Sequence, residues 1–343
     1  MQALVNYSDQ PGSVELREIP EPQPGRGQVL IRVRAVGVCG SDLHQWHGPV
    51  SWRVNYPVVL GHEFAGSVAA VGPDVYSWRV GDRVACETAA EICGECVYCR
   101  TGQYNVCPQR KGFGYGVNGA MATYVVARQE LLHRIPDGVT FEEAALTEPA
   151  AVAFNAIVEK SRPRPGDLVV ILGPGPIGLM ALQVARLFSP ACLVMVGLAR
   201  DEARLELARR LGADRIIVAD REDPVQVVRE LGDRLGADLV IDAVGVQETL
   251  RQSLEMVRPN GQITKIGWGR EPVGFSLDPL IAKAATLQGT FSHTWPTWER
   301  VLRLMALGRI DAHSLSETFP LSDWQIAFER MDSLAIAKAV LLP

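Results

Sequence analysis

Four cysteines stand close together in the first third of the chain, at a spacing that suits a metal ion. They form the pattern C-x2-C-x2-C-x7-C, made by Cys93, Cys96, Cys99 and Cys107. Four thiolates on one loop can surround a tetrahedral zinc by themselves, and such a closed site leaves no position for a substrate. An iron–sulfur cluster and disulfides are the alternatives that the spacing leaves open. We predict a structural zinc at this loop.

A second set of possible ligands is spread over three segments of the chain. These segments are Cys39-Gly40-Ser41-Asp42-Leu43-His44, Gly61-His62-Glu63 and Thr147-Glu148-Pro149. Each alone indicates little, because single histidines and cysteines are often ordinary buried residues. Together they offer a thiolate, an imidazole and two carboxylates. A catalytic zinc needs three protein ligands and a further position that is open to exchange, so these segments are candidates for such a site.

A glycine-rich turn lies between an apolar strand predicted at residues 168–172 and a helix predicted at residues 177–188. The turn follows the pattern G-x-G-x-x-G. The first glycine permits a tight turn, the second admits a pyrophosphate, and the third lets helix and strand pack closely. The start of the helix also offers N–H groups to phosphates. We therefore predict that a nicotinamide dinucleotide contacts Gly173, Gly175, Pro176, Ile177 and Gly178.

The choice between NAD and NADP depends on residues about 20 positions further along the chain. Arg200 precedes Asp201 there. A carboxylate at the strand end would select the ribose hydroxyl of NAD, whereas an arginine can pair with the 2′-phosphate of NADP. Arg200 slightly favours NADP. In the alternative interpretation it is a solvated side chain at the start of a helix that Asp201 caps.

The pattern of apolar runs divides the chain. Residues 1–150 hold short β-like runs separated by Gly and Pro, which is typical of a compact, mostly antiparallel β domain. Over residues 151–289, apolar strands alternate with helical stretches, as in an α/β fold with a doubly wound parallel sheet. We expect residues 290–343 to return to the first domain.

Cofactors of doubly wound sheets bind beyond the carboxyl ends of the strands. Two dipeptides follow strands predicted at residues 239–242 and 262–266, at the end where each strand leaves the sheet. They are Val244-Gly245 and Ile266-Gly267. We predict that both flank the dinucleotide.

Composition limits the classes of partner. The 343 residues carry a formal charge of −5 at pH 7, which argues against nucleic acid or an anionic membrane as a partner. The N-terminal residues lack a basic stretch followed by a long apolar run, so we expect no signal peptide. Seven cysteines, mostly clustered, fit metal binding in a reducing cytoplasm.

These motifs, in this order, resemble the zinc-containing medium-chain dehydrogenase/reductase family, in particular its polyol and threonine dehydrogenase branch. The resemblance extends over nearly the whole chain. It rests on the three ligand segments, Gly37-Val38 before the first of them, Gly81-Asp82-Arg83-Val84, the four-cysteine loop and the glycine turn. It implies a GroES-like catalytic domain built from both chain ends, with a Rossmann domain between them.

The resemblance assigns the ligands of the catalytic zinc. It makes Cys39 and His62 direct ligands and adds Glu63, which is a ligand in many polyol-type members. Glu148 stands where alcohol dehydrogenases of the family have a second cysteine. That difference implies a substrate other than ethanol, and leaves open whether Glu63 and Glu148 bind zinc directly or through water.

The resemblance also assigns supporting residues. Asp42 would hydrogen-bond His62 and fix its tautomer. Ser41 would take the substrate's hydroxyl proton, and His44 would pass it to solvent. Residues 291–296 would line the mouth of the substrate cleft.

The implied reaction is hydride transfer between a secondary alcohol or polyol and NAD(P), with zinc lowering the pKa of the hydroxyl. Threonine, another amino alcohol or a sugar acid are alternative substrates, and no Lys or Arg between Phe291 and Trp298 supports a phosphorylated one. A non-catalytic relative would lack one of Cys39, His62 or Ser41. A zinc-free, quinone-reductase-like relative would lack both the four-cysteine loop and Gly61-His62-Glu63, so the sequence argues against it. We expect two zinc ions per chain and a homo-oligomer, either a tetramer or a dimer.

Overall fold

The computed structural model describes residues 1–269 and 271–343. The chain forms two compact units. Unit 1 contains Met1–Glu148, His293–Leu307 and Ser316–Pro343, and unit 2 contains Pro149–Ser292 and Gly308–Leu315. None of the described helices is both long enough and apolar enough to cross a membrane.

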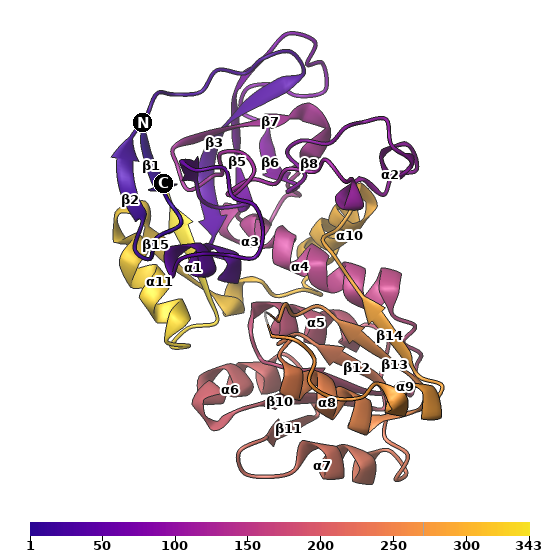
Figure 1. Ribbon diagram of the computed structural model, residues 1–343. Helices are drawn as coiled ribbons and strands as arrows, with labels where there is room; N and C mark the ends of the chain where they lie inside the picture. The colour runs from indigo at the N-terminus through magenta and orange to yellow at the C-terminus, as the bar shows by residue number, and fades with distance from the viewer. Residues whose placement is uncertain (270) are drawn as a thin grey trace. The chain divides into compact units, whose positions relative to one another are not determined.

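Unit 1 is built mainly from short strands in two sheets (Figure 1). The smaller sheet has the order β2-β1-β4, and the larger has the order β15-β16-β3-β5-β6-β8, with β7 also paired to β3. The strands are β1 (Gln2–Asn6), β2 (Val14–Glu18), β3 (Gln28–Gly37), β4 (Val58–Val59), β5 (Glu63–Val71), β6 (Arg83–Cys86), β7 (Tyr124–Arg128), β8 (Leu132–Arg134), β15 (Ser316–Pro320) and β16 (Lys338–Leu342). Its helices are α1 (Gly40–Trp46), α2 (Val97–Arg100), α3 (Phe141–Ala145), α10 (Trp295–Ala306) and α11 (Trp324–Asp332).

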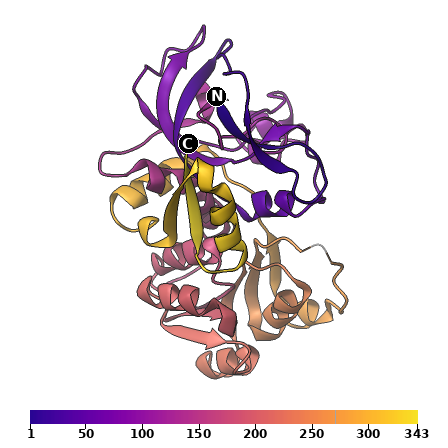
Figure 2. The same cartoon turned by 90° about the vertical axis from the view of Figure 1, so that its left-hand side faces the viewer.

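The last strand of the chain pairs with one of the first. Val340 and Leu341 of β16 stand opposite Gly37 and Val36 of β3 in an antiparallel register. Figure 2 shows the C-terminal segment, drawn in yellow, with β15 and β16 side by side in parallel. Side chains from both chain ends therefore share one hydrophobic core, which includes Leu4, Ile31, Phe64, Phe328 and Leu341.

Unit 2 contains a six-stranded parallel sheet in the order β11-β10-β9-β12-β13-β14. The strands are β9 (Leu168–Leu172), β10 (Cys192–Gly197), β11 (Arg215–Val218), β12 (Ala237–Asp242), β13 (Val257–Lys265) and β14 (Thr286–Gly289). Strand β9 is buried along its whole length, as a continuous apolar run in the middle of a parallel sheet should be. The predicted α/β fold class is confirmed.

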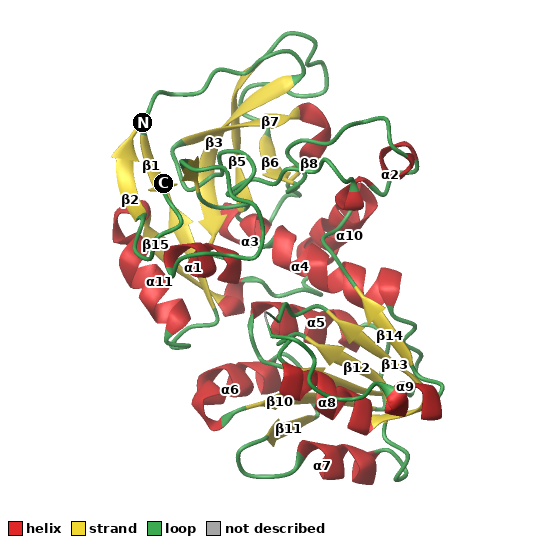
Figure 3. Ribbon diagram, in the orientation of Figure 1, coloured by secondary structure: helices red, strands yellow, loops and turns green. Residues whose placement is uncertain are grey.

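The helices of unit 2 alternate with these strands along the chain (Figure 3). They are α5 (Pro176–Arg186), α6 (Glu202–Arg210), α7 (Pro224–Leu231), α8 (Gln247–Met256) and α9 (Asp278–Ala282). Helix α4 (Thr147–Phe154) spans the point where unit 1 gives way to unit 2.

Residues 308–315 belong to unit 2, whereas the sequence suggested that all residues from 290 onward join the first domain. The side chain of Gln183 in α5 explains this. Its amide donates to the carbonyl oxygen of Asp311 (3.3 Å) and accepts from the N–H of the same residue (2.6 Å). A buried amide that satisfies both backbone groups ties this segment to the Rossmann-like sheet.

Candidate active site and metal centres

The four cysteines of the loop face one another. Their sulfur atoms all lie within 4.8 Å, with Cys93 and Cys99 3.9 Å apart and Cys93 and Cys107 3.6 Å apart. A tetrahedral zinc with Zn–S bonds of about 2.3 Å separates its sulfurs by about 3.8 Å. A disulfide would need about 2.05 Å, and all four cysteines are free. The loop geometry fits a four-thiolate metal site and excludes the disulfide alternative.

The backbone of the loop lowers the pKa of one of these thiols. Amide N–H groups of Cys96 and Glu95 point at the sulfur of Cys93 and lower the pKa of that thiol to about 6. Burial and the neighbouring thiols raise the pKa of Cys99 to about 12. One sulfur of the set is therefore a thiolate at neutral pH before any metal binds, which suits metal capture.

A second cluster joins Cys39, His62 and Glu63, although 22 residues separate the first two. One ligand atom from each lies within 4.8 Å of the others. Cys39 is the N-cap of α1, and Glu63 is the first residue of β5 with His62 immediately before it. The antiparallel register places Glu63 opposite Gly37 of β3, two residues before Cys39, so sheet pairing brings the segments together.

The cluster carries a surplus of negative charge. Burial alone would lower the pKa of His62, but the neighbouring Cys39, Asp42 and Glu148 raise it well above its ordinary value. Buried anions that hold a proton this firmly would also attract a divalent cation, which displaces the proton. The donor set of thiolate, imidazole and carboxylate is one that zinc accepts.

Small and polar residues shape this cluster. A Cβ on Gly37 would lie 2.2 Å from Oε2 of Glu63, so only glycine leaves room for that carboxylate. Asp42 is fully buried and accepts hydrogen bonds from the N–H of Cys39 (2.9 Å) and of Gly61 (3.3 Å). Asp42 therefore fastens the two ligand-bearing segments to each other through their backbones, while its hydrogen bond to the imidazole of His62 stays a prediction.

A lysine that the sequence analysis missed stands beside Glu63. Nζ of Lys338 donates to Oε1 of Glu63 at 2.7 Å and lies 2.5 Å from Oε2, and both side chains are buried. Oε2 makes no hydrogen bond within the part of the chain that the structure describes. Burial would lower the pKa of Lys338, but Glu63, Cys39 and Glu148 together raise it above its ordinary value. The pair is thus charged, and the ammonium of Lys338 lies against both carboxylate oxygens of Glu63.

Glu148, the remaining predicted ligand, is 7% exposed at the start of α4. Its Oε1 lies 3.2 Å from Nε2 of His293, which is also buried. Burial would raise the pKa of Glu148, but the hydrogen bond from His293 and the nearby His62 and Lys338 lower it below its ordinary value. Glu148 is therefore a carboxylate at neutral pH and can face a cation.

His293 and Lys338 had no spacing signal that could have revealed them. His293 lies within the segment predicted to line the cleft, but nothing in the sequence distinguishes it from its neighbours. Lys338 lies in an otherwise apolar final strand, and a charged residue in such a strand was the one hint available.

The two predicted proton-transfer residues share helix α1. Ser41 is half-buried and His44 is exposed, one turn further along the same helix. Residues three apart on a helix lie on the same face. This placement agrees with a path from a partly buried hydroxyl to solvent.

The glycine turn of unit 2 has the local geometry that a dinucleotide needs. Gly173 has φ +95°, and a Cβ on Gly178 would lie 1.9 Å from the carbonyl oxygen of Gly173. Gly175 is the N-cap of α5 and has no atom within 4 Å of where its Cβ would be. The first and third glycines are therefore required by packing, and the second leaves open space at the helix start for a phosphate. Pro176 and Ile177 begin that helix.

The turns after β12 and β13 pack closely. A Cβ on Gly245 would lie 2.2 Å from the carbonyl carbon of Gly267, and Lys265 donates to the carbonyl oxygens of both glycines (3.0 and 2.6 Å). Val244 and Ile266 precede these glycines at the carboxyl ends of neighbouring strands. The structure thus brings the two predicted dipeptides together at the carboxyl ends of two neighbouring strands of the sheet.

Arg200 and Asp201 lie in a short 3-10 helix, Ala199–Asp201, that follows the end of β10. Arg200 is exposed, whereas Asp201 is buried and accepts a hydrogen bond from the N–H of Leu198 (3.0 Å). Asp201 is therefore occupied by the backbone, and Arg200 is available to solvent or to a ligand.

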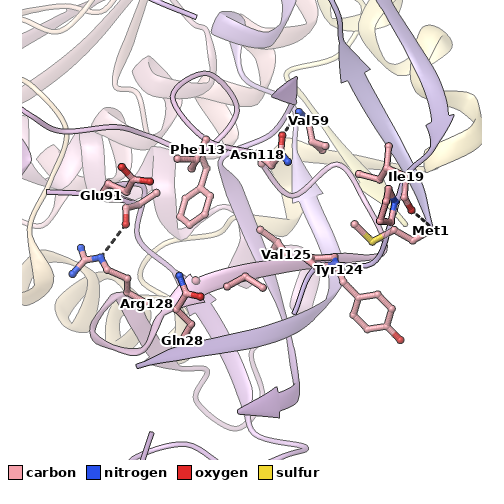
Figure 4. A pocket seen from close by; sticks show the side chains of 17 residues that line it. Met1, Ile19, Gln28, Val59, Glu91, Phe113, Asn118, Tyr124, Val125 and Arg128 are labelled. Atoms are coloured by element: carbon pink, nitrogen blue, oxygen red, sulfur yellow. Dashed lines mark hydrogen bonds between the residues drawn. The ribbon is translucent and has the colours of Figure 1, made fainter. Parts of the chain in front are cut away.

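A cavity of about 300 Å³ lies elsewhere in unit 1 (Figure 4). Among its lining residues are Phe113, Asn118, Tyr124 and Arg128. Of the described residues that line it, none is a predicted ligand or proton-transfer residue. It is separate from both metal clusters.

The sequence matches two family models. One is the alcohol dehydrogenase GroES-like domain, over residues 25–137, and the other is the zinc-binding dehydrogenase, over residues 176–306. The chain is 39% identical to a sorbitol dehydrogenase from Halalkalibacterium halodurans, with 100% of this chain and 99% of the relative covered. It is 40% identical to a D-arabitol-phosphate dehydrogenase from Enterococcus avium, with 92% and 89% covered.

A solved structure gives the same result. A zinc-binding dehydrogenase from Sinorhizobium meliloti 1021, bound to NADP, superimposes with a TM-score of 0.91 at 27% identity and covers 100% of this chain and 99% of its own. The chain belongs to the zinc-type medium-chain dehydrogenase/reductase family. The predicted family and enzyme class are confirmed: this is a zinc-dependent, NAD(P)-linked alcohol dehydrogenase.

Proposed function

We propose that this dehydrogenase oxidises a polyol at a secondary hydroxyl. A catalytic zinc binds in the buried cluster, which consists of Cys39, His62, Glu63 and Glu148, and a structural zinc binds in the cysteine loop. The convergence of the Cys39 thiolate, the His62 imidazole and the Glu63 carboxylate carries this proposal, and the buried Glu148 is close enough to raise the pKa of His62. The likeness to a sorbitol and an arabitol-phosphate dehydrogenase supports a polyhydroxylated substrate.

In this proposal Cys39 and His62 bind the catalytic zinc, and Glu63 and Glu148 face the same ion, directly or through water. Lys338 fixes the carboxylate of Glu63, with its ammonium 2.7 Å from Oε1 and 2.5 Å from Oε2. When bound, zinc lowers the pKa of the substrate hydroxyl and the nicotinamide accepts the hydride.

Ser41 accepts the hydroxyl proton, and His44 releases it to solvent from the next turn of α1. The half-buried hydroxyl and the exposed imidazole support this order. Asp42 joins α1 to the segment before β5 by accepting hydrogen bonds from the N–H groups of Cys39 and Gly61. These bonds fix the proton-transfer residues relative to the zinc ligands.

Unit 2 binds the dinucleotide. Gly173, Gly175 and Gly178 hold the pyrophosphate at the start of α5, and the two dipeptides after β12 and β13 flank the cofactor. Arg200 lies exposed at the end of β10, and we propose that it pairs with the 2′-phosphate of NADP. Replacing Arg200 with Ala should lower the preference for NADP over NAD by about tenfold, as the loss of a charge-assisted hydrogen bond of about 1.5 kcal/mol implies. An unchanged ratio of kcat/KM for the two cofactors would exclude this role.

A polyol phosphate is a second candidate substrate. A hollow of about 520 Å³ in unit 1 is lined by three basic residues, Arg53, Arg110 and Lys111, and by one acid, Glu91. Lys111 pairs with Glu91 at 2.6 Å, and Arg53 is exposed. No described residue that lines this hollow is a predicted zinc ligand or proton-transfer residue, so the likeness to the arabitol-phosphate dehydrogenase is what supports a phosphorylated substrate.

A substrate screen tests the proposal. Reduction of NAD and of NADP would be followed separately with polyols, diols, sugar acids, threonine and polyol phosphates, each with and without a chelator. We expect chelator-sensitive oxidation of a polyol or its phosphate. Turnover of threonine alone, or turnover that chelation leaves unaffected, would contradict the proposal.

We further propose that the enzyme is cytoplasmic and homotetrameric. Seven free cysteines are consistent with a reducing compartment. The molar mass of the purified enzyme by light scattering would distinguish a tetramer from a dimer.

A further inference from the structure

Glu148 is held from the side of α10 by a pair of buried side chains that the reaction scheme above does not use. His293 lies just before α10, and Trp298 lies in its first turns. His293 is 2% exposed and Trp298 is fully buried. Their hydrogen bonds form one chain, from Trp298 to His293 and from His293 to Glu148.

The partners in this chain determine which nitrogen of His293 carries hydrogen. Nε1 of Trp298 donates to Nδ1 of His293 at 2.6 Å. An indole N–H can only donate, so Nδ1 must be the nitrogen with the free lone pair. The hydrogen of the neutral ring is then on Nε2, which faces Oε1 of Glu148 at 3.2 Å and donates to it. Trp298 thereby selects one tautomer and aims its N–H at the carboxylate.

Trp298 is itself fixed in place. It stacks on His133, with ring centroids 5.4 Å apart and planes 14° apart, and it meets His293 edge-on at 5.1 Å. Carboxylates hold His133 on both sides, Glu87 at 3.2 Å and Glu299 at 2.6 Å. The indole therefore cannot rotate away without disturbing a packed, hydrogen-bonded core.

This support continues to the cysteine loop. The hydroxyl of Tyr104, which lies between Cys99 and Cys107, donates to Oε2 of Glu87 at 2.7 Å. The same hydroxyl accepts the backbone N–H of Trp295, the first residue of α10, at 2.6 Å. The loop that carries the structural metal thus also anchors the helix that carries Trp298.

We propose that His293 is a positioning residue: held as a single tautomer by Trp298, it orients the carboxylate of Glu148 towards the catalytic metal. This inference rests on the proposed function, in which Glu148 faces the zinc. One bond from Nε2 fixes the rotation of the carboxylate and leaves Oε2, together with the second lone pair of Oε1, for the metal or its water. Hydrogen bonds of this kind to a ligand raise metal affinity by about 10–100-fold.

Two amide variants separate orientation from simple filling of space. In His293→Gln, the side-chain amide reaches the position of Nε2 and can still donate to Glu148. In His293→Asn, the shorter amide reaches only the position of Nδ1, where it can accept from Trp298 but cannot touch Glu148. A purely structural role would treat the two variants alike, or would favour Asn for its bond to Trp298.

The test uses the full-length enzyme with Co²⁺ in the catalytic site and zinc in the loop. The readouts are the visible absorption spectrum of the bound Co²⁺ and its affinity by chelator competition, together with kcat and KM. We expect His293→Asn to weaken Co²⁺ binding by about 10–100-fold and to shift the spectrum, and His293→Gln to stay close to wild type. Trp298→Phe, which removes the donor to Nδ1, should fall between them.

Equal effects of Gln and Asn on affinity and spectrum, or a wild-type spectrum in Asn, would overturn the inference while leaving the proposed function intact. Wild-type enzyme that shows no Cys39-dependent Co²⁺ absorption would instead overturn the proposed function, and this inference with it. Thermal unfolding of each variant identifies any that has lost its fold, and Trp298→Phe then provides an independent test of the same bond.

Discussion

The two candidate metal sites of unit 1 are built in opposite ways. The loop site takes all four ligands from one short stretch of the chain. The buried cluster takes its ligands from segments around residues 39, 62 and 148, and the side chains of His293 and Lys338 hold two of these ligands. One site is local, and the other depends on the fold of the whole unit.

This difference indicates what each site contributes. A local thiolate loop has little structure to hold its sulfurs together except the metal, so the metal stabilises the loop. In the buried cluster, strand pairing, the cap of α1 and the pairs with Lys338 and His293 position the ligands beforehand. At such a site, one coordination position of the metal can be occupied by a substrate while the protein ligands stay in place.

Removing a thiolate from the buried cluster should have the largest effect. Cys39→Ala should lower kcat/KM by at least about a thousandfold, because a Lewis acid contributes several kcal/mol to the transition state. Binding of the dinucleotide, measured by fluorescence, should be retained, because the glycine turn lies in unit 2. Cys86→Ala, a buried thiol outside both clusters, is the matched control. Substantial turnover by Cys39→Ala would show that the buried cluster does not hold a catalytic zinc.

Removing a thiolate from the loop should affect stability more than chemistry. In Cys96→Ala we expect the melting temperature to fall by roughly 10 °C, since a structural zinc contributes several kcal/mol and each kcal/mol moves Tm by about 2–4 °C in a domain of this size. Turnover well below the new melting temperature should persist. Differential scanning calorimetry, with parallel assays, checks both. An unchanged melting temperature would show that the loop needs no metal.

The next effect compares two ion pairs of similar length. Lys338→Met should destabilise the protein by about 3–5 kcal/mol, because it leaves the buried carboxylate of Glu63 without a positive partner. Lys111→Met breaks the 2.6 Å pair with Glu91 beside the cysteine loop, where both side chains are about half exposed, and should cost less than about 1 kcal/mol. Urea unfolding gives both values. Adding Glu63→Gln to Lys338→Met should restore most of the loss, and no recovery would argue against a charged pair.

The smallest effect concerns the reactivity of the loop thiols. In metal-free protein, Cys93 should react with iodoacetamide at half its maximal rate near pH 6, because its pKa is lowered to about 6 and only the thiolate attacks. As pH falls below that value, the thiolate is protonated and labelling should stop. Cys99, with a pKa near 12, should stay unlabelled through neutral pH. Mass spectrometry resolves the sites, and a common profile centred near the ordinary value of about 8.5 would contradict the backbone effect.

Much of the fold followed from periodicity. The continuous apolar run at residues 168–172 and the glycines after it predicted a parallel sheet with a dinucleotide turn, and β9 and α5 lie where that pattern indicated. The assignment of residues 308–315 to unit 2 could not be predicted. It depends on two hydrogen bonds from the side chain of Gln183, and such long-range contacts leave no periodic signal.

The candidate site was predictable to different extents in its two parts. Four cysteines with short, fixed spacings indicate a shared metal on their own, because the chain between them is too short to separate them. The ligands of the buried cluster became convincing only through the order of several motifs. Lys338 and His293 escaped notice because a buried partner is defined by a contact across more than a hundred residues, and single Lys and His residues carry no pattern.

The number of zinc ions per chain, measured together with turnover on the same samples of wild type, Cys39→Ala and Cys96→Ala, distinguishes a catalytic from a structural metal most directly. We expect about two ions in the wild type, one in the loop and one in the buried cluster, and about one ion in each variant. Turnover should disappear only in Cys39→Ala. A single zinc in the wild type would contradict the presence of two metal sites. Loss of turnover in Cys96→Ala with activity retained in Cys39→Ala would contradict a catalytic role for the buried cluster and a structural role for the loop.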